Sequence, residues 1–398
     1  MNIAMITPGM LPVPAVNGGA VEVLIQYLIE GNEKEKNYSI DLYTVANNEL
    51  GGIKYNHTNI IEISPSFFTK AKNIVINNIY RLFGIKKWRT SYGRAVVKKM
   101  NKQKYDYVVV HNNLMAYRDI YEKTDNKDNL VYVLHNNADD GDENHRIIVE
   151  LVAKTAKKIL AVSEHTKKDF LSLCYTDNID VLYNCIDEEK YLNRITEKER
   201  SILRGKYGIS EEDFVFLYSG RLDVYKGVLE LIESFNTIKK QNVKLLIVGE
   251  SWFDKKSKSD QYTNSLVKAA EKSKEQIIFT GFINPCDMPS IYQISDCLVI
   301  PSIWEEPFGV VALEGMASKV FLIVTNSGGL MEIVDEKCAF IVNKEKNMVD
   351  DLAEKMNFLL DDDQVREEKI AAGYRVFNSR MDFHKECYYG NFCRKIGC

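Results

Sequence analysis

Short apolar runs alternate with amphipathic stretches along most of the chain. The runs are rich in Val, Ile and Leu, and several end at Pro, Ser or Gly, which is typical of buried strands followed by turns. The strands predicted in this way are Asn2–Thr7, Ser39–Val45, Asn59–Ser64, Tyr105–Val110, Asn129–Leu134, Lys158–Val162, Phe214–Tyr218, Lys244–Val248, Ile277–Phe279, Cys297–Ile300 and Phe321–Val324. Helical periodicity separates them, as in Glu164–Leu173. This alternation predicts an α/β protein with parallel sheets.

The length of 398 residues predicts two domains, because one hydrophobic core rarely serves so long a chain. We take the charged stretch Glu188–Arg200 as the linker, which gives a first domain of residues 1–188 and a second of residues 189–376. Each half repeats the strand and helix alternation. We therefore expect two Rossmann-like domains.

Composition narrows the function classes. A net charge of −4 argues against a nucleic-acid binder. No apolar run approaches the roughly 20 residues needed to span a bilayer, and Met1–Pro8 is too short for a signal peptide. We expect a cytoplasmic protein, or one held only peripherally at the inner face of the plasma membrane. Its eight scattered cysteines are then reduced, structural thiols.

One segment departs from this composition. Residues 70–104 contain eleven Lys or Arg and no acid, with aromatic and aliphatic residues interleaved. Such a block suits an anionic membrane surface or a lipid-linked diphosphate acceptor. The alternative is a solvated helix packed on its apolar side.

A first candidate site follows the predicted strand Phe214–Tyr218. The turn Ser219–Gly227 contains Gly220, Arg221 and Lys226 and leads into a helix from Val228. Two cations five residues apart on a strand-to-helix turn can straddle a diphosphate, with Arg forking across two oxygens and Lys acting as a point charge. The alternative is a surface turn with two solvated cations.

A second candidate site lies in Ile303–Ala317, after the predicted strand Cys297–Ile300. Pro307 suits the opening of a helix, and Gly309 permits a close approach where free N–H groups and the helix dipole favour an anion. Glu306 and Glu314 lie eight residues apart on either side of this point, and their carboxylates can accept hydroxyl groups. Together these features would hold a sugar nucleotide.

Two further strand ends carry candidate residues. Tyr105–Val110 leads into His111-Asn112-Asn113, and Asn129–Leu134 leads into His135-Asn136-Asn137. Ligand chemistry gathers at the carboxyl ends of parallel strands, although a histidine can equally be a hydrogen-bonded cap. The loop Asn17-Gly18-Gly19 before the first helix is a possible phosphate or backbone-approach site, or merely a turn.

The Glu306-x7-Glu314 pattern in its Glu-Pro-Phe-Gly context, with the turn Ser219–Gly227, resembles the retaining glycosyltransferases of family 4. That family has the GT-B fold, in which two Rossmann-like domains face each other across a cleft. The resemblance implies an acceptor-binding N-terminal domain, a C-terminal domain that binds the nucleotide sugar, and a final helix, at about residues 377–398, that returns to the first domain.

The resemblance also implies roles for individual residues. Glu306 would contact the donor sugar, Glu314 the nucleotide ribose, and His111 the region near the donor sugar, with His135 as a weaker candidate. Arg221 and Lys226 would neutralise the leaving diphosphate. The implied donor-binding set is completed by Gly18, Gly19, Gly220, Gly281, Phe282, Pro307, Phe308, Gly309 and Val310.

A metal is not expected. Asp140-Gly141-Asp142 has the Asp-x-Asp spacing with which GT-A glycosyltransferases hold a metal. It lies among β/α repeats, however, and a solvated turn before a helix explains its charges. We therefore expect no metal site and no cofactor beyond the nucleotide-sugar substrate.

The resulting hypothesis is transfer of a hexosyl group, with retention, from a nucleotide sugar to a glycan or lipid-linked acceptor hydroxyl, in bacterial cell-surface polysaccharide or glycoconjugate synthesis. UDP is the favoured nucleotide. Two alternatives stay open: a sugar-nucleotide epimerase of GT-B-like fold, and a non-catalytic GT-B partner subunit.

Overall fold

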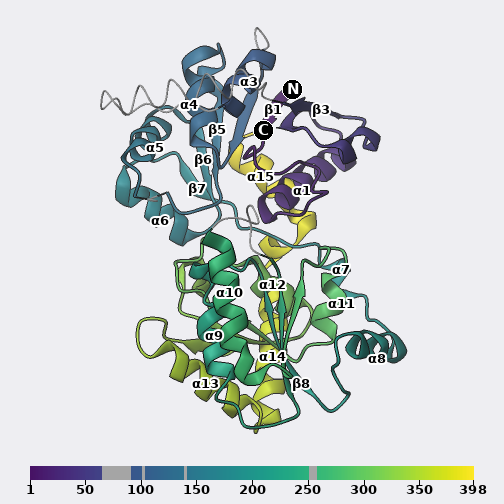
Figure 1. Cartoon of the computed structure of the whole chain (residues 1–398). Helices are drawn as coiled ribbons and strands as arrows, with labels where there is room; N and C mark the ends of the chain where they lie inside the picture. Colours follow the sequence, from purple (N-terminus) through teal and green to yellow (C-terminus); the bar gives the residue numbers. More distant parts are fainter. Residues whose placement is uncertain (65–90, 101–103, 139–140, 251–257) are drawn as a thin grey trace. The chain divides into compact units, whose positions relative to one another are not determined.

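A computed structural model describes residues 1–64, 91–100, 104–138, 141–250 and 258–398. They form two compact units (Figure 1). Unit 1 comprises Met1–Cys185 and Lys385–Cys398, and unit 2 comprises Ile186–His384. Each unit contains one parallel sheet with helices on it. The prediction of an α/β protein with two Rossmann-like domains is confirmed.

Unit 1 is built on a seven-stranded sheet in the order β3-β2-β1-β4-β5-β6-β7. Its strands are β1 (Asn2–Ile6), β2 (Ser39–Val45), β3 (Thr58–Ile63), β4 (Tyr107–His111), β5 (Leu130–Leu134), β6 (Lys158–Ala161) and β7 (Ile179–Val181). Its described helices are α1 (Ala20–Glu35), α3 (Ser91–Met100), α4 (Leu114–Lys123), α5 (Glu143–Thr155), α6 (Glu164–Leu173), α15 (Lys385–Ile396) and the 3₁₀ turns η1 (Asn48–Gly52) and η2 (Lys127–Asn129).

Alternate residues of these strands enter two separate cores, because successive side chains point to opposite faces of a sheet. Ile3 and Met5 pack with α1 and α15 on one face, and α15 lies beside α1 (Figure 1). Ala4 and Ile6 pack with α3, α4, α5 and α6 on the other. Both faces are therefore covered, which explains why the strands read as continuous apolar runs.

Unit 2 repeats the plan with six parallel strands in the order β10-β9-β8-β11-β12-β13. The strands are β8 (Phe214–Ser219), β9 (Val243–Val248), β10 (Ile277–Gly281), β11 (Cys297–Ile300), β12 (Phe321–Thr325) and β13 (Phe340–Val342). The described helices are α7 (Glu189–Leu192), α8 (Glu197–Lys206), α9 (Val228–Phe235), α10 (Lys258–Ala270), α11 (Met288–Gln293), α12 (Val310–Ala317), α13 (Met348–Leu359), α14 (Asp363–Ser379) and the 3₁₀ turns η3 (Val224–Lys226), η4 (Glu271–Ser273), η5 (Gly328–Glu332) and η6 (Met381–Phe383).

The unit boundaries differ from the predicted ones. The stretch taken as a linker contains α7 and the first turn of α8, whose N-terminus is closed by a capping box between Thr196 and Glu199. The return to unit 1 comes at Lys385 instead of residue 377, because α14 packs on α12 and Phe377 is buried within unit 2. The charge of residues 188–200 did not distinguish a linker from helices, and the aromatic content of residues 377–398 did not show where the chain returns to unit 1.

The basic block of residues 70–104 is described only in part. Within α3, Tyr92, Val96 and Met100 are buried, and the Lys99 ammonium donates to the Glu62 carbonyl oxygen at 2.7 Å. Residues 70–90 and 101–103 lie outside the described residues, so membrane binding by the block stays a prediction. Among the helices that are described, none is both long enough and apolar enough to span a bilayer.

The strand orders create one reversal point in each sheet. In unit 1 the connections from β1 and β4 run to opposite sides, and in unit 2 those from β8 and β11 do so. Open α/β sheets bind ligands outside the carboxyl ends of the strands at such a point. In unit 2 both predicted motifs follow the two strands concerned.

Glycines allow the strand ends of unit 2 to approach one another closely. Gly249, which follows β9, has φ +140°, and a Cβ built on it would lie 1.8 Å from the Gly220 carbonyl oxygen. Gly227 has φ +68°, and its Cβ would lie 1.8 Å from the Pro301 carbonyl oxygen. Backbone, not side chain, blocks a larger residue at both positions.

We predict that Gly249→Ala lowers the free energy of unfolding by about 2 kcal/mol or more, because it adds backbone strain to a clash with a carbonyl group. Differential scanning fluorimetry should show a melting temperature lower by several degrees. Gly205→Ala is the matched control, since Gly205 lies in α8 with nothing near its Cβ position. That variant should gain about 0.5–1 kcal/mol from helix propensity. Equal melting temperatures for the two variants would contradict the packing described here.

Candidate active site

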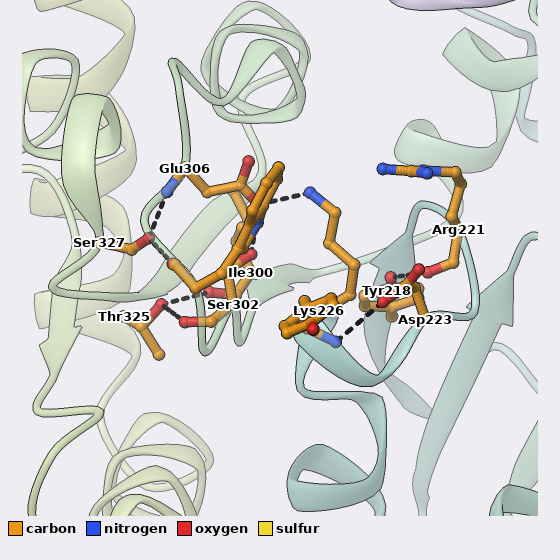
Figure 2. A network of polar contacts seen from close by, with 11 residues as sticks. Tyr218, Arg221, Asp223, Lys226, Ile300, Ser302, Glu306, Thr325 and Ser327 are labelled. Carbon is orange, nitrogen blue, oxygen red and sulfur yellow. Dashed lines mark hydrogen bonds and ion pairs between the residues drawn. The ribbon is translucent and has the colours of Figure 1, made fainter. Parts of the chain in front are cut away.

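The turn after β8 holds two cations in a fixed backbone. The Tyr218 hydroxyl donates to the Arg221 carbonyl oxygen at 2.6 Å, and the Asp223 carboxylate accepts from the Tyr225 N–H at 3.0 Å. Figure 2 shows the side chains of Arg221 and Lys226 extending to the same side of this turn. The prediction that one turn presents both cations therefore agrees with the geometry.

Lys226 forms an ion pair with Glu306, 80 residues further along the chain. The Lys226 ammonium lies 2.6 Å from Glu306 Oε1, and the two side chains are only 19% and 8% exposed. The Ser302 hydroxyl donates to the same carboxylate oxygen (Figure 2). The ammonium also lies 5.1 Å from the centre of the Trp304 ring, a favourable cation–π contact. The two sequence motifs thus meet at one largely buried pair.

Residues after β12 fix the backbone of Glu306 from a third strand end. The Glu306 N–H donates to Ser327 Oγ at 2.9 Å, and this hydroxyl donates to the Trp304 carbonyl oxygen at 2.6 Å. The Gly329 N–H donates to the Glu306 carbonyl oxygen at 2.7 Å. Thr325 closes the network by donating to the Ser302 carbonyl oxygen at 2.7 Å. Glu306 is consequently held through both its backbone N–H and its backbone carbonyl oxygen.

A second ion pair braces the same two loops. The Lys344 ammonium lies 2.6 Å from Glu305 Oε1, with the lysine side chain only 8% exposed. The other oxygen of Glu305 accepts from the Gly328 N–H at 2.6 Å. Glu305 therefore links Lys344, in the loop after β13, to the Gly-rich turn after β12, directly beside Glu306.

Electrostatics keep Glu306 ionised. Burial opposes the charge, but the Lys226 ammonium and the hydrogen bonds from Lys226, Ser302 and Trp304 outweigh it, so the pKa of Glu306 lies below its ordinary value of 4.5. A charged carboxylate accepts hydrogen bonds only. In this state Glu306 can orient hydroxyl groups.

Glu314 lies in the opposite electrostatic situation. Its carboxylate accepts from the Tyr292 hydroxyl at 2.6 Å, and Tyr292 packs edge-on against Tyr191 of α7. Burial raises the pKa of Glu314 above its ordinary value, and hydrogen bonds from Tyr292 and Tyr191 offset this only in part. The folded protein therefore bears a cost for the charge at this position.

The start of α12 differs from the prediction. The helix begins at Val310, so Pro307 lies in the preceding loop and does not open the helix. Gly309 is the N-cap, and its φ of +101° is outside the helical range, which explains why the helix cannot begin earlier. A Cβ at Gly309 would lie 2.7 Å from Leu330 Cδ1. Phe308 is buried against Phe383, with ring centres 6.0 Å apart, so it anchors the loop.

The remaining predicted positions of unit 2 lie at neighbouring strand ends. Gly220 follows β8, and Gly281 ends β10 with φ +71°. Phe282 is 58% exposed, and its N–H donates to Glu250 Oε1 at 3.2 Å. Its backbone N–H is therefore already bonded in this structure.

The predicted histidine lies in unit 1 and is paired. His111 Nδ1 and His135 Nε2 are 3.1 Å apart, with the rings stacked, and both residues are buried. Burial lowers the pKa of His111 well below 6.5, with the neighbouring His135 adding to the effect, and burial lowers the pKa of His135 to about 3. Both rings are therefore neutral near pH 7, and one proton lies between them.

The glycine loop of unit 1 also lies at a reversal point. Gly18 has φ +73°, and Gly19, with φ +98°, is the N-cap of α1. A Cβ on Gly19 would lie 2.2 Å from a carboxylate oxygen of Glu22. Burial raises the pKa of Glu22 to about 7, against the hydrogen bond from its own N–H. Sequence reasoning missed this buried acid, although its place in the first turn of the helix was a signal.

No cluster of three or more His, Cys, Asp or Glu suited to a metal occurs in the parts of the chain that the structure describes. Asp142 caps α5 by accepting from the Asn144 N–H at 2.7 Å. Asp140 lies outside the described residues.

Comparison with known proteins identifies the family. A family profile described as "Glycosyl transferases group 1" matches residues 199–376, and one described as "Glycosyltransferase Family 4" matches residues 51–190. The chain is a glycosyltransferase of family 4.

Similar proteins agree with this assignment. The glycosyltransferase is 29% identical over 238 residues to the lipopolysaccharide 1,2-N-acetylglucosaminetransferase of Salmonella typhimurium, an alignment that covers 59% of this chain and 58% of that protein. It is 27% identical to the putative glycosyltransferase YtcC of Bacillus subtilis, with 92% and 84% covered. The crystal structure of Anabaena HepE in complex with UDP and glucose has the same fold, with a TM-score of 0.77, 19% identity and 100% and 99% covered.

Several residues of this glycosyltransferase site were not predicted. Ser302, Ser327 and Lys344 each follow the end of a parallel strand of unit 2. Each is the second residue after its strand, and polar residues so close to the end of an apolar run were a usable signal, but the strand order was needed to show which of them meet.

We predict that replacing Glu306 or Glu314 by the uncharged residue glutamine changes the stability of the protein in opposite directions. Because its folded-state pKa is lowered, Glu306 contributes stability above about pH 4.5 that is lost as the pH falls through the folded value. Glu306→Gln should destabilise unit 2 at pH 7 by about 3 kcal/mol, since it leaves a nearly buried lysine unpaired, and the difference should shrink in acid. Because the pKa of Glu314 is raised, its charge opposes folding at pH 7, and Glu314→Gln should raise the melting temperature there.

Thermal melting between pH 3.5 and 8 tests both effects. Glu211→Gln is the control, because it breaks the more exposed Arg200–Glu211 pair of the same unit and should change little. The electrostatic description is wrong if Glu306→Gln and Glu314→Gln shift melting in the same direction at pH 7.

Proposed function

We propose that this glycosyltransferase moves a hexosyl group from a nucleotide sugar, with UDP favoured, to an acceptor hydroxyl, and that the anomeric configuration is retained. The observation that carries the proposal is the arrangement of Arg221, Lys226 and Glu306 at the reversal point of the unit 2 sheet. Two cations suit a diphosphate, and the adjoining charged carboxylate suits sugar hydroxyls.

The proposed chemistry assigns each group a task. The bond between the anomeric carbon and the diphosphate oxygen breaks while the acceptor oxygen bonds to the same face of that carbon. The acceptor proton passes to the departing diphosphate. Arg221 and Lys226 stabilise the negative charge as it develops, which is a preorganised electrostatic contribution. Glu306 orients the sugar and Glu314 binds the ribose, while the role near the donor sugar that the resemblance implies for His111 stays a prediction.

The Lys226–Glu306 pair supports a specific first step. A diphosphate that approaches Arg221 and Lys226 adds negative charge beside Glu306, so Lys226 shares its three donors between the two. The partial burial of the pair makes this interaction strong, because charges interact more strongly away from water. No metal is proposed in this step, since the two cations supply the positive charge.

Relatives support a role in cell-surface glycan synthesis. One similar protein is named for N-acetylglucosamine transfer in lipopolysaccharide, and another for capsular polysaccharide biosynthesis. A structural neighbour was crystallised with UDP-glucose. We extend to this chain a UDP-sugar donor and a glycan or lipid-linked acceptor. Attachment to an anionic membrane surface through residues 70–104 is part of the same proposal.

We predict that Arg221→Ala slows transfer by about 10²–10³-fold, the loss typical of one preorganised charge contact in a transition state. The assay measures release of nucleotide diphosphate from a nucleotide-sugar donor in the presence of a cell extract that contains the acceptor. Arg375→Ala is the control, because Arg375 is also exposed in unit 2 but lies on α14 and not on the turn after β8. Turnover near that of the unaltered chain for Arg221→Ala would show that Arg221 does not hold the diphosphate.

A donor panel tests the substrate class. UDP-, GDP- and dTDP-sugars are added in the presence of EDTA, and melting is followed by fluorimetry. A donor at about 100 times its Kd should stabilise the protein by roughly 2.7 kcal/mol, and we expect this for the UDP series. No stabilisation by any donor would favour a non-catalytic partner subunit, and hydrolysis of the donor independent of any acceptor would favour an epimerase. Anomeric NMR of the transfer product then establishes whether the configuration is retained.

A further inference from the structure

Helix α15 ends in a turn that brings two cysteines together. The helix stops at Ile396, and Gly397, with φ +79°, reverses the chain directly after it. The N–H groups of Gly397 and Cys398 both donate to the Cys393 carbonyl oxygen at 3.0 Å. The bond from Cys398 is characteristic of a Schellman motif, in which the side chains at the two ends of this bond commonly touch. Both of these positions are cysteine.

The two cysteines lie at the core of unit 1 that α15 forms with α1 (Figure 1). Cys393 is buried in this core, and Cys398 is partly exposed and packs against it. The Tyr107 hydroxyl of β4 donates to the Gly397 carbonyl oxygen at 2.9 Å. This bond fastens the turn to the sheet, so the backbone holds both cysteines in place. Both thiols are free in the structure.

Hydrogen bonds make the two thiols chemically unequal. The Cys393 thiol and the Tyr38 hydroxyl donate to the Cys398 sulfur, and they lower the pKa of the Cys398 thiol to about 7 although burial opposes this. The bond to Cys398, together with burial, raises the pKa of Cys393. Near neutral pH, Cys398 therefore supplies a thiolate and Cys393 stays a thiol. The thiolate is the form of cysteine that acts as a nucleophile.

Two other roles fit the pair less well. A metal site needs further ligands, and no cluster of three or more His, Cys, Asp or Glu suited to a metal occurs among the described residues. Packing alone would be served by two apolar side chains, which are usual at these positions of the motif. It needs neither a partly exposed thiol nor hydrogen bonds to its sulfur. A partly exposed thiolate beside a second cysteine is instead typical of a site of oxidation.

We propose that Cys393 and Cys398 are a site of reversible oxidation, at which hydrogen peroxide produces a disulfide. The Cys398 thiolate attacks one peroxide oxygen, the O–O bond breaks, and the departing hydroxide takes up the proton that Cys398 released on ionisation. The Cys393 sulfur then attacks the sulfenic acid on Cys398. An S–S bond forms, the S–O bond breaks, and hydroxide leaves as water with the Cys393 proton. Two thiols thus lose two electrons, and one peroxide becomes two waters.

The disulfide has two consequences for unit 1. It ties the last turn of α15 to the residue that follows Gly397, and so resists fraying of the helix by which the chain returns to unit 1. It also protects Cys398 from further oxidation to the irreversible sulfonic acid, because a thiol reductant can restore both cysteines. No residue of unit 2 takes part, so this modification does not depend on the proposed glycosyl transfer.

The test exposes the full chain, first reduced and then freed of reductant, to a small excess of hydrogen peroxide at pH 7. Trypsin cuts after Arg394 and Lys395, between the two cysteines. Mass spectrometry should therefore find two peptides joined by a disulfide, and dithiothreitol should separate them. Alkylation of Cys398 by iodoacetamide should rise with pH around a midpoint near 7. A midpoint at the ordinary cysteine value of about 8.5 would contradict the proposed activation.

Two variants assign the bond. Cys398→Ser should abolish the joined peptides, and the reduced variant should keep its melting temperature because Cys398 is only partly buried. Cys387→Ser is the matched control, since Cys387 is also partly buried, lies on the same helix and occurs in the same tryptic peptide as Cys393. That variant should form the disulfide as the unaltered chain does.

Three results would overturn the proposal. The first is a folded chain in which peroxide does not join Cys393 to Cys398. The second is loss of the joined peptides in Cys387→Ser, which would assign the bond to the wrong cysteine. The third is oxidation of the exposed Cys286 before Cys398, because exposure alone would then decide which thiol reacts.

Discussion

The buried pair between Lys226 and Glu306 is the interaction on which the geometry of unit 2 depends. Each charge would be costly alone at its level of exposure, and their attraction offsets this only when the distance is short. That requirement constrains two loops that are 80 residues apart in sequence. Ser302, Ser327 and Gly329 complete the constraint, because they bond the side chain or the backbone of Glu306. Stability and site geometry thus have one physical origin here.

The sheet topology makes this pair possible. β8 and β11 are neighbours in space although two strands separate them in sequence, so the loops that follow them emerge side by side. Gly227 lets the first loop pass against the Pro301 carbonyl at the root of the second. The same order recurs in unit 1, where the ends of β1, β4 and β5 border a pocket. In each unit, therefore, the point where the strand order reverses brings together the loops that border the site of unit 2 and the pocket of unit 1.

Local patterns were sufficient for most of the strands and for the two motifs of unit 2. Interior parallel strands are apolar runs, and the spacing of Arg221 from Lys226, or of Glu306 from Glu314, is short-range information. The Glu305–Lys344 brace and the His111–His135 pair depend on which strands lie together, which no local spacing reveals. Pro307 was misplaced because the helix start was set by the positive φ of Gly309, not by proline. The three-residue strands β7 and β13 were too short to stand out.

Unit 2 is one uninterrupted stretch inserted into unit 1, and the chain crosses between them at residues 185–186 and 384–385. The two crossings are paired, since the Ile186 N–H donates to the Phe383 carbonyl oxygen at 3.0 Å and Ile186 bridges His384. A gene segment that encodes residues 186–384 can therefore be exchanged as a cassette between homologous chains. Both junctions lie outside the sheets, so recombination there keeps each hydrophobic core whole.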